Sequence, residues 1–258
     1  MCKAFTESIL GYQVYRDSAE SCLTDIMQSI DQKKNGKWLA CLNPHSYVVA
    51  IDNTNFQEAL RAADWLVPDG VGIVLASRIL GGNIRQRLTG PDIFYGLNNH
   101  MQESGGYSVF FLGSTEETLG SISERMSKDW PDIRIAGTFS PPFRSSFSDD
   151  DIELMVSRVN SAQPDVLWVG MTAPKQEEWI HKVLPQLNVC FVAAVGAVFD
   201  FYIGRINRSH PLFQRMGLEW LPRLLREPRR LWRRMFVSAP IFLWNVLRSR
   251  FKFTHRVE

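Results

Sequence analysis

Residues 166–195 read VLWVGMTAPKQEEWIHKVLPQLNVCFVAAV, and this stretch decides the fold class. It opens and closes with apolar runs, Val166–Val169 and Val189–Val195, whose length and content are typical of strands buried on both faces of a sheet. Between the two runs, Pro174 can occupy the first turn of a helix. The order of strand, helix and strand indicates two parallel strands joined by a helix that covers the sheet.

The same alternation continues towards the N-terminus. The segments in which apolar side chains recur at helical spacing are 22–30, 56–63, 116–126 and 152–159. The shorter apolar runs that we predict as strands are 38–42, 65–67, 107–112 and 133–136. We therefore predict an α/β fold class: a Rossmann-like, mostly parallel sheet covered by helices, with a basic helical C-terminal appendage.

The charge of the chain is divided unevenly. From Arg205 to Glu258 there are 13 Lys and Arg against 3 Asp and Glu, a net charge of +10, so the first 204 residues carry −8 of the total +2. We place a boundary near Ile203, between an α/β domain at 1–203 and an Arg- and Trp-rich appendage at 204–258. The split indicates that the appendage meets something anionic: nucleic acid, phospholipid or a phosphorylated ligand.

The appendage has the pattern of a basic amphipathic helix. One face carries the arginines Arg223, Arg226, Arg230, Arg233 and Arg234, and Trp232 lies among the apolar residues opposite. This pattern is typical of an element that lies in a membrane interface, but a terminal helix with a solvated arginine face shares it. The apolar run 235–247 carries no charge, but it is shorter than the roughly 20 residues that a spanning helix needs.

Composition excludes several classes of protein. Hydrophobic residues make up 45% of the chain, which argues against disorder. The four cysteines form no CxxC pair, which argues against a disulfide framework or a zinc site and suits a reducing compartment. Because no GxGxxG run is present, a dinucleotide-dependent oxidoreductase is disfavoured.

Asp69 is the sharpest candidate for catalysis. In a parallel sheet, ligands bind beyond the carboxyl ends of the strands. Asp69 follows the predicted strand 65–67 and stands between Pro68 and Gly70. An acid at this point could take a proton from an attacking hydroxyl. Pro-Asp-Gly is also a common turn, so the tripeptide alone leaves both interpretations open.

Two further polar groups lie at the starts of predicted helices. Arg87 and Thr89 precede a predicted helix, and a guanidinium beside a helix N-terminus is a good seat for a diphosphate. Lys175 and Gln176 lie in the first turn of another helix and can donate to phosphate or sugar hydroxyls. A solvated loop and an ordinary polar first turn explain the same residues, so these interpretations also stay open.

Two motifs are better explained as helix starts than as ligand sites. Asp149–Asp151 superficially matches an acidic pair that holds a divalent metal, but Ser148 followed by Asp151 fits a capping box. Gly113-Ser114-Thr115 could cradle a phosphate, although a plain helix cap is the simpler interpretation. We therefore predict no metal site.

Five stretches, taken in order, carry a more specific signal. They are Ala63-Asp64 with Pro68–Gly72, Arg87–Asp92, Pro174–Glu177, Val195–Asp200, and Gly217–Trp220 with Arg223 and Glu227-Pro228. Together they resemble the WecG/TagA/CpsF family of bacterial glycosyltransferases, over about residues 11–234.

The resemblance implies transfer of a sugar, often N-acetylmannosamine, from a UDP donor to a polyprenyl-diphosphate-linked sugar. It implies inverting chemistry with no known metal requirement. By the same resemblance, Asp69 is the general base, Arg87 and Gln176 bind the donor diphosphate or the reacting sugar, and Asn43 lies in the cleft. The arginine-rich appendage is then the part that reaches the membrane and helps to close the site.

Two departures from the family pattern bear on the substrates. Cys41 stands where members often have threonine, two residues before Asn43, and 208–211 read Arg-Ser-His-Pro in place of the usual Arg-Ala-Pro. The first changes one substrate contact, and both indicate that the donor or acceptor differs. Some relatives use glucose in exopolysaccharide assembly.

The combined prediction is an inverting, metal-independent hexosyltransferase without a cofactor. Thr89, Lys175 and Cys41 join the substrate-binding candidates. The expected partners are a UDP-sugar, a polyprenyl-diphosphate-linked sugar and an anionic membrane surface, not nucleic acid, and a homo-oligomer stays open. The expected location is the cytoplasm, peripherally at the inner face of the cell membrane. The alternative is a nucleotide-binding regulatory protein whose basic tail contacts nucleic acid.

Overall fold

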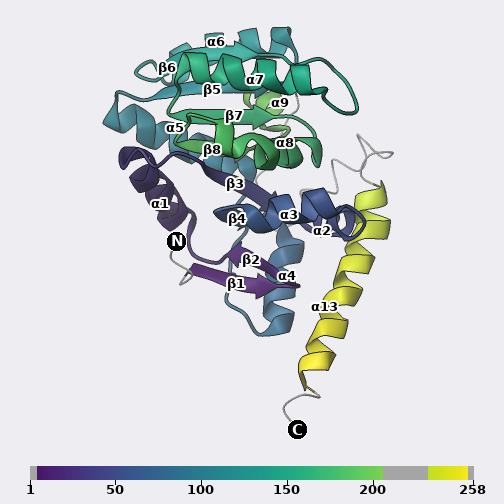
Figure 1. The fold of residues 1–258 in the computed structure, drawn as a ribbon. Helices are drawn as coiled ribbons and strands as arrows, with labels where there is room; N and C mark the ends of the chain where they lie inside the picture. The colour runs from purple at the N-terminus through teal and green to yellow at the C-terminus, as the bar shows by residue number, and fades with distance from the viewer. Residues whose placement is uncertain (1–4, 206–231, 255–258) are drawn as a thin grey trace.

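Six parallel strands form the central sheet of the molecule (Figure 1). In the order in which they pair, they are β4 (Trp65–Pro68), β3 (Lys37–Leu42), β8 (Phe191–Ala194), β7 (Val166–Gly170), β5 (Ser108–Gly113) and β6 (Arg134–Phe139). The computed structural model describes residues 5–205 and 232–254. The predicted α/β fold class is confirmed.

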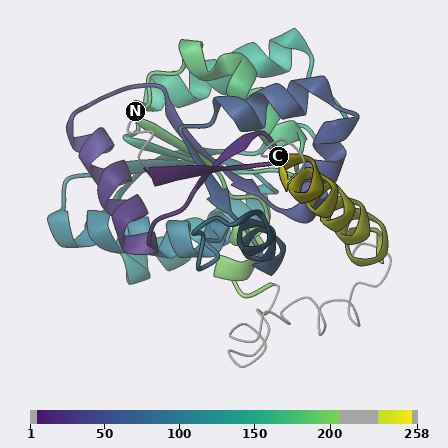
Figure 2. The same ribbon diagram turned by 90° about the horizontal axis from the view of Figure 1, so that it is seen from below.

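Helices lie on both faces of the sheet, as Figure 2 shows from below. One face is covered by α1 (Ala19–Asp31), α5 (Gly90–Ser104), α6 (Glu116–Asp129) and α9 (Val198–Tyr202). The other core is built with α2 (Pro44–Ile51), α3 (Thr54–Ala62), α4 (Val71–Leu80), α7 (Asp149–Ala162) and α8 (Lys175–Val183), followed by a short 3₁₀ turn at Leu184–Gln186. Successive strand residues point to opposite faces, so Trp168 enters one core and Val169 the other.

An antiparallel hairpin precedes the sheet and was absent from the sequence-based expectation. It consists of β1 (Thr6–Ile9) and β2 (Tyr12–Tyr15), joined by Leu10 and Gly11 with φ values of 49° and 87°. Two residues with positive φ match the right-handed twist of the paired strands. The hairpin packs beside β4 and α4, and the Glu7 carboxylate accepts the Asn83 N–H at 2.6 Å.

A C-terminal helix lies along the outside of α2 and α4 (Figure 1). It comprises a π-helical turn at Arg234–Ser238 and then α13 (Ala239–Thr254). Phe242 and Val246 are buried in the core that α2 and α4 share. Within the described residues, no helix has both the length and the apolar content needed to cross a membrane. The domain boundary near Ile203 stays a prediction, because 206–231 lie outside the described residues.

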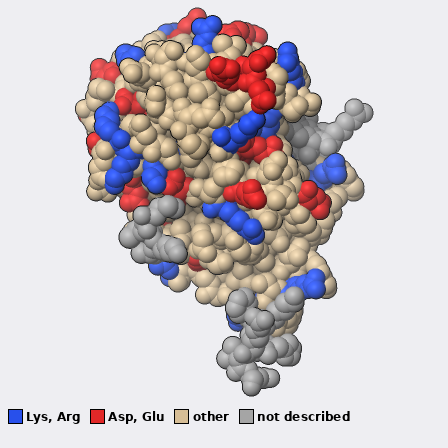
Figure 3. Space-filling view, viewed as in Figure 1, with Lys and Arg blue, Asp and Glu red and all other residues tan. Residues whose placement is uncertain are grey.

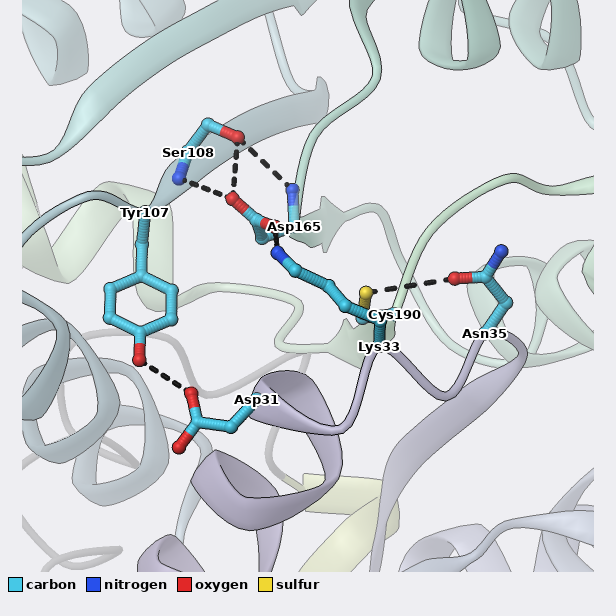
Figure 4. A network of polar contacts seen from close by, with 7 residues as sticks. All are labelled: Asp31, Lys33, Asn35, Tyr107, Ser108, Asp165 and Cys190. Carbon is cyan, nitrogen blue, oxygen red and sulfur yellow. Dashed lines mark hydrogen bonds and ion pairs between the residues drawn. The ribbon is translucent and has the colours of Figure 1, made fainter.

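The amino ends of the strands, here called the amino edge, are joined by a polar network (Figure 4). Asp165, just before β7, accepts hydrogen bonds from Lys33 Nζ at 2.6 Å, from the Ser108 N–H at 2.9 Å and from Ser108 Oγ at 2.8 Å. Beside it, the Tyr107 hydroxyl donates to Asp31. Burial alone would raise the pKa of Asp165, but the bonds from Lys33 and Ser108 hold that pKa below its ordinary value.

Candidate active site

The opposite side of the sheet, here called the carboxyl edge, brings Asn43 and Asp69 together. The Asp69 N–H donates to the Leu42 carbonyl at 2.8 Å, which extends the pairing of β3 and β4 by one residue. Asn43, the residue after Leu42, donates from Nδ2 to Asp69 Oδ2 at 3.3 Å. Both side chains are half-buried. The structure therefore places the predicted base beside a predicted substrate-binding residue.

Helix α2 fixes which way the Asn43 amide faces. Its Oδ1 accepts from the His45 and Ser46 N–H groups at 3.0 and 2.9 Å and so caps the helix. With the oxygen held there, Nδ2 is the amide atom that faces Asp69. Helix α2 was not predicted from the sequence, although Asn43 followed by Pro44 is a recognisable helix start.

Helix α4 begins immediately beyond Asp69 and lies close to the start of α2. A Cβ atom on Gly72 would lie 2.4 Å from Pro44 Cγ, so this approach requires glycine. Two helix N-termini thus flank the Asp69 segment. The positive ends of both helix dipoles favour negative charge at this point of the carboxyl edge.

The loop that contains Arg87 also reaches this point. The Leu88 N–H donates to the Pro68 carbonyl, at the end of β4, at 2.8 Å. Arg87, the residue before Leu88, is half-buried. Thr89 caps α5: its N–H and its hydroxyl donate to Asp92 Oδ2 at 2.9 and 2.6 Å, and its side chain is buried. The structure explains Thr89 as a helix cap, and its contact with substrate stays a prediction.

Gln176 joins the loops that follow β7 and β8. Its Oε1 accepts from the Met171 N–H at 3.3 Å and from the Gly196 N–H at 3.1 Å. Its Nε2 donates to Glu177 Oε1 at 2.9 Å. Lys175, by contrast, donates to the Arg144 carbonyl at 2.9 Å, and burial lowers its pKa. A substrate contact by either residue stays a prediction.

Cys41 lies in β3, two residues before Asn43. Burial raises the pKa of its thiol well above the ordinary value, and the carboxylates of Asp69, Glu177 and Asp92 raise it further. The thiol therefore stays protonated.

Glu177 is the residue at this edge that sequence reasoning missed. Its side chain is only 3% exposed. Burial raises the pKa of its carboxyl group to about 7. Its place beside Gln176 in the first turn of α8 was visible in the sequence, but a glutamate there is ordinarily solvated.

The two predicted helix caps are confirmed. Ser148 Oγ accepts from the Asp151 N–H at 3.2 Å while Asp151 Oδ2 accepts from the Ser148 N–H at 3.0 Å. Thr115 accepts from the Thr118 N–H at 3.2 Å at the start of α6. In residues 5–205 and 232–254, no three His, Cys, Asp or Glu side chains are grouped so as to hold a metal ion.

The C-terminal helix meets the same helix that carries Asn43. His45 Nδ1 lies 2.9 Å from Ser238 Oγ, and burial lowers the pKa of His45, with Arg234 and Arg233 lowering it further. Trp232 is half-exposed and lies against Phe236. The predicted contacts Arg223, Arg226 and Arg230 lie outside the described residues.

The described surface does not concentrate charge of one sign on the face in Figure 3, where acidic and basic side chains are interspersed.

Parallel α/β sheets bind their ligands beyond the carboxyl ends of the strands, and helix N-termini at that edge favour anionic groups. Residues 7–256 match the glycosyl transferase WecG/TagA/CpsF family, and the chain belongs to this family. It is a glycosyltransferase, and the resemblance seen in the sequence is confirmed.

Three relatives share the name N-acetylglucosaminyldiphosphoundecaprenol N-acetyl-beta-D-mannosaminyltransferase. The chain is 32% identical over 219 residues to that of Bacillus spizizenii (strain ATCC 23059 / NRRL B-14472 / W23), covering 85% of this chain and 81% of the relative. It is 26% identical over 250 residues to that of Bacillus subtilis (strain 168), covering 95% and 92%. It is 27% identical over 227 residues to that of Staphylococcus aureus (strain MW2), covering 86% and 84%.

Proposed function

We propose that this glycosyltransferase moves a hexose or N-acetylhexosamine from a UDP-sugar to a polyprenyl-diphosphate-linked sugar. The transferred sugar is of the N-acetylmannosamine or glucose type, and the product serves a bacterial surface polysaccharide or exopolysaccharide. Support for the acceptor class comes from the names of the three relatives, which describe transfer to N-acetylglucosaminyl-diphosphoundecaprenol.

Asp69 is the general base in this proposal, and its 3.3 Å contact with Asn43 is the observation that carries the assignment. The α2 cap holds Asn43, so the carboxylate has a fixed neighbour and a fixed position. Asp69 removes the proton of the acceptor hydroxyl as its oxygen bonds to the anomeric carbon. The bond to UDP breaks on the opposite side, UDP leaves with the electron pair, and the anomeric configuration inverts. General-base assistance is typically worth about 10²–10⁴-fold in rate.

The leaving diphosphate needs positive charge, which this chain can supply from its own groups. Arg87 lies at the loop joined to β4, and the N-terminus of α4, which no side chain caps, offers N–H groups at the same edge. Gln176 can add an amide hydrogen. We propose that these groups stabilise the departing UDP without a metal ion.

The C-terminal helix is the proposed membrane contact. Phe242 and Val246 attach it to the catalytic domain, whereas its other side is open and aromatic. The most exposed aromatic side chains there are Trp232, Phe236, Trp244 and Phe251. Exposed aromatic rings beside Arg233 suit the interface of an anionic membrane better than a nucleic acid backbone, which needs the arginines alone. Such docking would hold the enzyme at the inner face of the membrane, beside a lipid-linked acceptor.

The proposed function is tested by incubating the purified protein with a panel of UDP-sugars and synthetic polyprenyl-diphosphate sugars. We expect release of UDP and one new β- or α-linked product whose anomeric configuration is opposite to that of the donor. Binding to duplex DNA with no transfer to any acceptor would favour the regulatory alternative.

A further inference from the structure

Glu177 is a buried ionisable group that the reaction scheme above does not use. Its Oε1 accepts a hydrogen bond from Gln176, whereas its Oε2 has no hydrogen-bond partner among the described residues. Burial of such a group is costly unless the group is paired. An apolar residue would fill the same space at lower cost, so the carboxyl group has a use other than packing.

The contacts of Gln176 indicate that use. Its Oε1 faces two N–H donors, those of Met171 and Gly196. If the amide rotated by half a turn, its NH₂ group would face those donors instead, and all three bonds would be lost. Glu177 Oε1 accepts from Nε2 and so holds Nε2 on its own side, while the two backbone donors hold Gln176 Oε1 on the side of the two loops.

We propose that Glu177 is a positioning residue for sugar transfer: it orients the Gln176 amide and, through it, the loops that follow β7 and β8. The part that concerns turnover rests on the proposed function. The carbonyl oxygen of a neutral carboxyl group also accepts hydrogen bonds, so the role does not require charge. This matters because the carboxyl pKa is raised to about 7.

Three variants test the proposal in the full-length protein. Glu177→Met keeps the volume and removes the acceptor, so we expect turnover to fall by about tenfold or more. Glu177→Gln keeps an acceptor and should be at least about fivefold faster than the methionine variant. Glu178→Met is the matched control: it makes the same change on the next residue, whose carboxylate accepts from Asn53 at 2.7 Å on the side of α3. If Glu177→Met does not fold, Glu177→Asp, which shortens the reach by one methylene, replaces it.

A double-mutant cycle shows whether Glu177 acts through Gln176. In a Gln176→Leu background, Glu177→Met should cost less than about twofold, because the amide that it orients is gone. Losses that multiply instead would overturn the proposal, as would a methionine variant as fast as the glutamine variant.

A spectroscopic readout separates this inference from the proposed function. The backbone amide resonances of Met171 and Gly196 should shift in Glu177→Met and stay in place in Glu178→Met, whether or not any sugar is transferred. Resonances that do not move would overturn the positioning role. Resonances that move in a protein without transferase activity would instead contradict the proposed function and leave the positioning of Gln176 supported.

Discussion

The two edges of the sheet use the same kinds of side chain for different ends. At the amino edge, Asp165 is enclosed by three donors from Lys33 and Ser108, and its pKa lies below the ordinary value. At the carboxyl edge, the Glu177 carboxyl is buried with one donor, and its pKa is raised to about 7. A carboxylate that its neighbours saturate stabilises the fold, whereas one held with few donors in a poorly solvated place is available for chemistry or positioning.

We therefore expect some substitutions to lower the free energy of unfolding and others to lower the rate of transfer. Two asparagine residues that cap helices should show the largest difference between these effects. Asn43 and Asn53 both cap a helix through Oδ1, but Nδ2 of Asn43 donates to Asp69 and Nδ2 of Asn53 donates to Glu178. Either change to alanine should cost about 1 kcal/mol of unfolding free energy, the usual value of an N-cap.

Their effects on transfer should differ. Asn43→Ala should slow transfer by about 10- to 100-fold, the size of one hydrogen bond to a charged group. Asn53→Ala should stay within about twofold of wild type per folded molecule. The measurement is turnover at saturating donor and acceptor, with urea unfolding as the stability control. Equal losses in both variants would mean that Asn43 is only a helix cap.

The exposed side of the C-terminal helix allows a further test, of binding to a membrane surface. Changing Trp232, Phe236 and Trp244 to serine should weaken binding to anionic liposomes by about tenfold or more, since each substitution removes apolar surface that would be buried at the interface. Truncation is a poorer test, because Phe242 and Val246 are buried against the domain.

Sedimentation with liposomes measures this loss, and Phe143→Ser, another exposed aromatic, is the control. Charge reversal at Arg233 and Arg234 should weaken binding more at low salt than at high salt. Unchanged sedimentation of the triple serine variant would remove the membrane assignment.

At the amino edge, Asp165→Ala should lower the free energy of unfolding by about 1–3 kcal/mol, because it leaves buried donors of Ser108 without an acceptor. The rate per folded molecule should not change. The folded-state pKa of Asp165 lies below the ordinary value of about 3.9, so its stabilisation is present above that pH and is lost as pH falls through the folded-state pKa. Urea unfolding of both proteins at neutral and acidic pH should therefore show the difference shrinking on acidification.

Removal of divalent metal should have the smallest effect. Asp149–Asp151 begins α7 as a capping box and an ion pair with Lys182, so it has a structural role already. Excess EDTA should leave the transfer rate unchanged. Loss of activity that Mn²⁺ or Mg²⁺ restores would show that transfer depends on a metal.

The strands whose two faces are both covered were predictable from the sequence. Strands β7 and β8 are apolar throughout because both faces are covered, and this pattern is visible in sequence. The hairpin β1–β2 was missed because its strands have four residues each, and α2 was missed because its apolar residues show no clear helical period.

The candidate site was predictable in its members but not in their contacts. Asp69, Asn43 and Gln176 all lie at the carboxyl edge, because the strands that precede them run parallel to one another. The bonds of Gln176 Oε1 to the loops after β7 and β8, and the burial of Glu177 beside it, depend on the pairing of β7 with β8. The residues at the start of α8 do not show which strand pairs with β7.

We expect catalysis to depend on the carboxyl edge of the sheet and stability on the amino edge. The transfer rates of two isosteric variants, Asp69→Asn and Asp165→Asn, test this division when measured on folded protein with a UDP-sugar and a polyprenyl-diphosphate-linked acceptor. Asp69→Asn should lose about 10²–10⁴-fold in turnover while UDP binding is retained, and Asp165→Asn should keep its rate. An Asp69→Asn variant that retains more than about a tenth of wild-type turnover would contradict this expectation.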